Sequence, residues 1–83
     1  MMAARAEPAT LHDAHASATI RRPAADATRS DWAGFHLTNA RMYRTVADHD
    51  RWHHHEALYW ADYEERQAAR FSPPPKEVES EPS

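Results

Sequence analysis

The chain has 83 residues and a formal net charge of -3, and its mean hydropathy of -0.93 describes a polar chain that supports at most one small domain. The lack of cysteine excludes disulfide frameworks, thiolate zinc fingers, iron–sulfur ligation and thiol catalysis. No apolar run approaches the roughly 20 residues that cross a bilayer, and Glu7 and Asp13 fall where a signal peptide would be apolar. We therefore expect a cytoplasmic protein with no membrane partner.

Residues 1–30 are expected to form a flexible leader. Within it, Thr10 followed three residues later by Asp13 has the form of a helix capping box, which predicts a short helix over residues 10–22. Pro23 would end that helix, because the residue before a proline avoids helical backbone angles. Ser17, Thr19 and Ile20 are weak helix formers, so this helix should be only weakly stable by itself.

The segment 31–71 carries the main helical signal, since it lacks proline and has no glycine after Gly34. Ser30 is the expected N-cap, and Asp31 suits the positive end of a helix. At 100° per residue, one stripe along this segment contains Phe35, Met42, Val46, His49, His53, Trp60, Gln67 and Phe71.

The apolar face of this segment changes direction near residues 48–50, since Trp52, Tyr59 and Tyr63 lie about 80° to one side of the stripe. A continuous or kinked helix about 60 Å long would explain the change, and so would a helical hairpin with its turn at 47–50. The lack of Gly, Asn or Pro at the junction favours continuity, whereas the two aspartates favour the hairpin.

These signals predict an all-α protein. One long amphipathic helical segment, continuous, kinked or folded as a hairpin, follows a disordered or weakly helical N-terminal region. Residues 72–83 combine a proline run with three glutamates and should form a disordered acidic tail.

The run DHDRWHHHE at 48–56 is the unusual polar cluster. On a continuous helix His49, His53 and Glu56 would share one face, with a spacing that suits zinc or another divalent ion and leaves a fourth position open. A solvated His-rich surface is the simpler interpretation. A metal-binding helical protein is therefore an alternative function, and no other cofactor is expected.

The aromatic side chains point to a protein partner. Aromatic residues and arginine are enriched at interface hot spots, and a solitary helix has no second face of its own on which to bury three tryptophans. We therefore expect a small non-enzymatic accessory subunit, adaptor or inhibitor that docks on a larger protein or on a second copy. The expected anchors are Trp52, Tyr59, Trp60 and Tyr63, with Phe35, Met42 and Val46 extending the contact.

Arginine supplies nine of the ten basic residues, and Arg41, Arg44 and Arg51 partly share a helix side. A small dimeric DNA-binding regulator is therefore a second alternative. Asp48 lies among these arginines, and the negative net charge disfavours contact with phosphates. No nucleophile–base set is recognisable, so we expect no enzymatic activity.

The tripeptide Trp-Ala-Gly at 32–34 resembles the Trp-x-Gly turn that joins the two long helices in a family of small secreted helical hairpins. Here Pro23 interrupts the preceding segment, and the acidic residue that follows a tyrosine by four positions in that family is absent after Tyr59 and Tyr63. The resemblance is limited to three residues and transfers no function to this chain.

Overall fold

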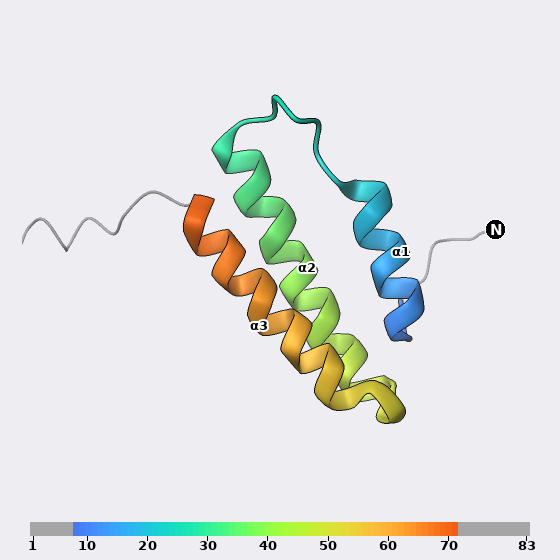
Figure 1. Cartoon of the computed structure of the whole chain (residues 1–83). Coiled ribbons are helices and arrows are strands. Elements are labelled where there is room, and N and C mark those ends of the chain that lie inside the picture. The colour runs from blue at the N-terminus through green and yellow to red at the C-terminus, as the bar shows by residue number, and fades with distance from the viewer. Residues whose placement is uncertain (1–7, 72–83) are drawn as a thin grey trace, which may run out of the picture.

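A computed structural model describes residues 8–71, and this part of the chain contains helices and no strand (Figure 1). The expected all-α class is confirmed. Its elements are α1 (Leu11–Arg21), α2 (Arg29–His49), the short 3₁₀ helix η1 (Arg51–His53) and α3 (His54–Phe71). No helix among the described residues is long and apolar enough to cross a membrane. The predicted disorder of residues 1–7 and of the tail 72–83 lies outside the described range.

The helix starts follow from capping side chains. At α1, the Thr10 hydroxyl accepts a hydrogen bond from the Asp13 backbone N–H at 3.1 Å, as the sequence predicts. The second helix begins two residues earlier than expected, because Thr28 and not Ser30 is its N-cap. Thr28 and Asp31 each accept a hydrogen bond from the other's backbone N–H, which completes a capping box that Ser30 could not form with Asp31.

Of the two arrangements left open by the sequence, the structure adopts the hairpin, in which α3 returns along α2 (Figure 1). The helical backbone ends at Asp50, where φ is -101° and ψ is 85°. No described residue has a positive φ, so the reversal needs no glycine. The absence of glycine at the junction therefore did not require a continuous helix. Hydrogen bonds from Asp50 N to Val46 O and from His53 N to Asp50 O close the turn.

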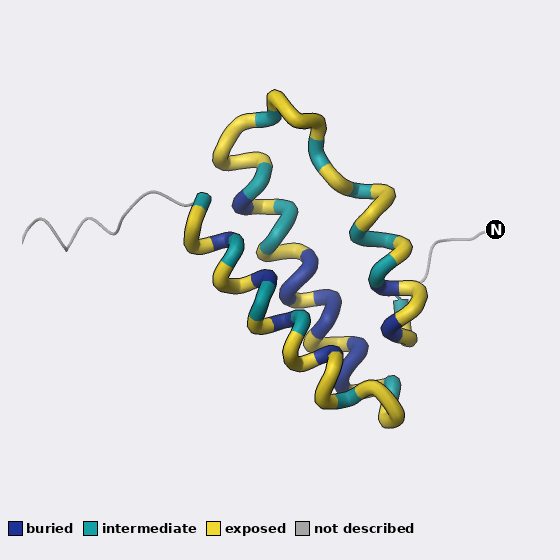
Figure 2. Tube along the Cα trace, in the orientation of Figure 1, coloured by how far each residue is buried: buried dark blue, intermediate teal, exposed yellow. Residues whose placement is uncertain are grey.

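Small side chains line the interface between α2 and α3. Six alanines of these two helices are buried, which lets the backbones approach closely (Figure 2). The larger buried side chains Met42, Tyr43 and Val46 share a core cluster with Leu11 and Ala14 of α1. The main core cluster comprises Leu11, Ala14, Met42, Tyr43, Val46, Ala47, Ala57 and Ala61. The hairpin therefore shelters much of its own apolar surface, which a solitary helix could not do.

A chain of polar contacts also crosses the three helices. Glu64 of α3 is buried, and its Oε1 lies 2.5 Å from His36 Nδ1 and 3.4 Å from Asn39 Nδ2 on α2. Asn39 Oδ1 in turn accepts a hydrogen bond from the Arg21 guanidinium of α1 at 2.7 Å. Because buried polar groups are costly without partners, the contacts of Glu64 with His36 and Asn39 fix α3 against α2, and Arg21 links α1 to them.

Candidate protein-binding surface at the hairpin turn

Trp52 is the most exposed large apolar side chain among the described residues. It lies in η1, between the two long helices, and 93% of its surface is exposed. No ring contact or hydrogen bond joins its side chain to another described residue. A tryptophan is among the side chains that gain most from burial, so its placement at the tip of the hairpin calls for a functional explanation.

The backbone that carries Trp52 is held in place from several directions. The Asp50 carboxylate accepts hydrogen bonds from the Leu11 backbone N–H at 3.0 Å and from His53 Nδ1 at 2.9 Å. The Leu11 N–H has the largest effect and holds the pKa of Asp50 below its usual 3.8; burial opposes this shift, and the contacts with His53 add to it. On the other side, His54 Nδ1 donates to the Ala47 carbonyl at 2.7 Å. The turn is thus fastened to both α1 and α2.

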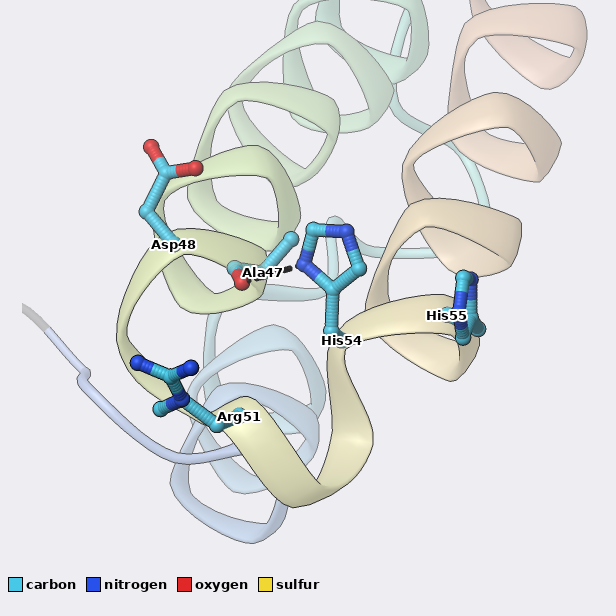
Figure 3. Close-up of a pocket in the computed structure, with 5 residues that line it drawn as sticks. All are labelled: Ala47, Asp48, Arg51, His54 and His55. Atoms are coloured by element: carbon cyan, nitrogen blue, oxygen red, sulfur yellow. Dashed lines mark hydrogen bonds between the residues drawn. The ribbon is translucent and has the colours of Figure 1, made fainter.

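An open pocket of about 440 Å³ adjoins this turn, and Ala47, Asp48, Arg51, His54 and His55 line it. Figure 3 shows the His54 ring turned toward the Ala47 carbonyl, with Arg51 and Asp48 on one side of the turn and His55 on the other. The pocket therefore offers a carboxylate, a guanidinium and two imidazoles next to the segment that carries Trp52. Such a set can form hydrogen bonds and ion pairs at the polar rim of an interface.

The predicted metal ligands His49, His53 and Glu56 are not brought together. His49 ends α2 and donates from Nδ1 to the Thr45 carbonyl at 2.8 Å, His53 bonds Asp50 in η1, and Glu56 is exposed on α3. Within residues 8–71, no three His, Asp or Glu side chains are grouped to hold a metal ion. The spacing argument assumed one continuous helix, and the reversal at Asp50 removes that assumption.

The four predicted aromatic anchors have different environments. Besides the exposed Trp52, Tyr59 has 57% of its surface exposed, whereas Trp60 and Tyr63 are half-buried. The Trp60 ring lies 5.4 Å from each of the two tyrosine rings, and on its inner side it contacts Tyr43 at 6.2 Å and His15 at 5.2 Å between centroids. Trp60 thus links the core to a partly exposed aromatic ridge on α3.

Three further predicted contact residues lie inside the fold. Met42 and Val46 are buried between the helices, and Phe35 is half-buried against Trp32, with 5.7 Å between the ring centroids. Met42 and Val46 stabilise the hairpin and are not available to a partner in this conformation. The sequence prediction for these two residues needs this correction, because the stripe that they share became an intramolecular interface.

Sequence reasoning missed the buried carboxylate of Glu64 and the pocket at the turn. A periodic signal for Glu64 exists, since Ala57, Ala61, Glu64 and Ala68 recur at helical spacing and all are buried. The pocket has no such signal, because it forms only where the chain reverses. Comparisons with protein-family models, with curated proteins and with solved structures find no match for this chain.

Proposed function

We propose that this chain is a small, non-enzymatic helical protein-binding module, acting as an accessory subunit, adaptor or inhibitor in the cytoplasm. It docks on a larger protein through the hairpin turn, with Trp52 as its anchor. The observation that carries the proposal is the 93% exposure of this tryptophan on a turn that hydrogen bonds hold in place.

Two physical arguments support this assignment. Tryptophan and arginine are the residue types most enriched among side chains that dominate binding energy, and Arg51 precedes Trp52 directly. In addition, a side chain presented on a fixed turn loses little backbone freedom when it binds, so more of the burial energy appears as affinity.

The surroundings of Trp52 suit the rim of such an interface. Tyr59, on the following helix, supplies a second exposed aromatic ring, and Asp48 and Arg51 at the pocket supply opposite charges. A partner with an apolar pocket for the indole and polar groups around it would match this arrangement.

Site-specific photocrosslinking in cells that naturally make this protein tests the proposal. A benzophenone amino acid is placed at position 52, at position 59 and, as a control, at exposed Ala16 on α1. We expect one protein to be crosslinked from positions 52 and 59 but not from position 16. Equal adducts at all three positions, or none at 52, would refute docking through the turn.

The purified pair then gives the energetic test. Trp52→Ala should weaken binding at least about tenfold while the free energy of unfolding changes by less than about 0.5 kcal/mol, because 93% of its surface is exposed and little packing is lost. Ile20→Ala, which truncates another exposed apolar side chain, is the matched control. Sedimentation of wild type and Trp52→Ala distinguishes a foreign partner from a second copy.

A further inference from the structure

Helix α1 covers the aromatic part of the hairpin with very little apolar surface of its own. It buries Leu11 and Ala14 and packs Ala18 partly against the core, while Ile20 has 82% of its surface exposed. Figure 2 shows that most of this helix is exposed or only partly buried. One leucine and two alanines are a small apolar contribution for ordering eleven residues.

Polar contacts supply much of what otherwise holds α1 on the hairpin. The Leu11 N–H bonds Asp50 at one end, His15 Nδ1 lies 2.7 Å from the Tyr43 hydroxyl in the middle, and Arg21 bonds Asn39 at the other end. Each of these bonds exchanges with water when α1 lifts, so each contributes only modestly to holding it down. The hairpin, in contrast, is held by buried alanines on both helices together with Met42, Tyr43 and Val46.

We propose that the hairpin surface beneath α1 is a binding groove for an amphipathic helix, and that α1 is a displaceable lid on that groove. This inference rests on the proposed protein-binding function and adds its regulation. When α1 lifts, the inner faces of Tyr43 and Trp60 become accessible beside Tyr59 and Tyr63, and the aromatic ridge on α3 becomes one continuous surface.

The residues of α1 define the partner that fits. The groove accepts an apolar side chain at the position of Leu11, a small one at Ala14 and a hydrogen-bonding group at His15. Ala18 is only partly buried, so a partner with a larger apolar side chain there would cover more of the groove than α1 does. An amphipathic helix with this pattern competes with α1 for one surface.

Hydrogen exchange of the full chain tests the lid. Amides of residues 15–21 should exchange at least tenfold faster than those of Val46 and Ala61. Leu11→Ala should raise the exchange rates of residues 15–21 by a further tenfold or more and leave the exchange rates in α2 and α3 unchanged. Ile20→Ala, on the exposed side of α1, should change neither the exchange rates of residues 15–21 nor those of α2 and α3. Exchange of all three helices in one cooperative step, accelerated equally by Leu11→Ala, would overturn the proposal.

A peptide titration tests the groove itself. The probe is a synthetic peptide of residues 10–22 with Ala18→Leu, added to full-length wild type and to Leu11→Ala, and the Trp60 indole N–H is followed by NMR. We expect the Trp60 signal to shift at lower peptide concentration in Leu11→Ala, because its lid is open more often. A scrambled peptide should cause no shift.

The two proposals can fail separately in these experiments. No shift of Trp60 at millimolar peptide, or a shift confined to Trp52, would overturn the groove and leave docking through the turn intact. A Trp60 shift together with failed crosslinking from position 52 would uphold the groove and refute Trp52 as the anchor.

Discussion

The Glu64 carboxylate on α3 lies 2.5 Å from the His36 imidazole on α2, and about a tenth of each side chain is exposed. The same carboxylate oxygen accepts from Asn39, which is fully buried. Two polar groups of α2 thus depend on one acidic residue of α3, and through Asn39 the contact extends to α1.

Glu64→Ala should lower the free energy of unfolding by about 2–4 kcal/mol, because it leaves buried polar groups of His36 and Asn39 without their acceptor. Glu65→Ala is the control. It removes an ion pair with Arg44 in which about half of each side chain is exposed, and it should cost less than about 1 kcal/mol. Urea denaturation measures both, and equal losses would contradict a structural role for the buried carboxylate.

Tyr43 predicts a loss of stability at alkaline pH. Burial raises the pKa of its hydroxyl from 10.0 to about 12, with a further contribution from the Glu64 charge and an opposing one from Arg21. Between these values the unfolded chain ionises the phenol while the folded chain keeps it neutral. The part of the stability that depends on the neutral Tyr43 is therefore fully present below pH 10 and is lost as the pH rises toward 12. The expected slope is about 1.4 kcal/mol per pH unit.

Chemical denaturation at pH 9, 10, 11 and 12 measures this loss. Tyr43→Phe should flatten the profile over that range, whereas Tyr59→Phe, which changes an exposed ring, should leave it as in wild type. A steep profile that persists in Tyr43→Phe would assign the alkaline loss to another group.

Asp50 predicts the opposite pH dependence. Its pKa is lowered in the folded chain, chiefly by the Leu11 N–H. The stability that the ionised carboxylate contributes is therefore fully present above pH 3.8 and disappears as the pH falls through the pKa of the folded chain. Asp50→Asn should therefore lower the Tm at pH 7, and the difference from wild type should shrink below pH 3.8. Thermal melting from pH 7 to pH 2 tests this, with Asp48→Asn, an exposed neighbour, as the control.

Because buried alanines line the interface between α2 and α3, larger side chains at these positions should destabilise the hairpin. Ala61 is completely buried, so Ala61→Leu must force α2 and α3 apart and should cost about 1–3 kcal/mol or more. Ala69→Leu, on the exposed side of the same helix, should change stability by less than about 0.5 kcal/mol. If Ala61→Leu melted like wild type, the close approach of the helices would be wrong.

The local signals of the chain were sufficient to predict its helices. Thr10 and Asp13 mark the start of α1, Pro23 limits its end, and the long stretch without proline, and without glycine after Gly34, predicts the helical segment that forms α2 and α3. These features act within one or two helical turns, so they can be recognised without knowing which segments meet. The stripe through Met42 and Val46 likewise identified buried positions, although not the surface that buries them.

Only the tertiary structure decided what those helices do. Asp50 ends α2 with a non-helical backbone and accepts a hydrogen bond from Leu11, 39 positions away, and no local pattern contains that contact. The reversal separates the three predicted metal ligands and leaves Trp52 at the tip. Glu64 is buried because Asn39 and His36 face it from another helix, and helical periodicity alone carries no information about such partners.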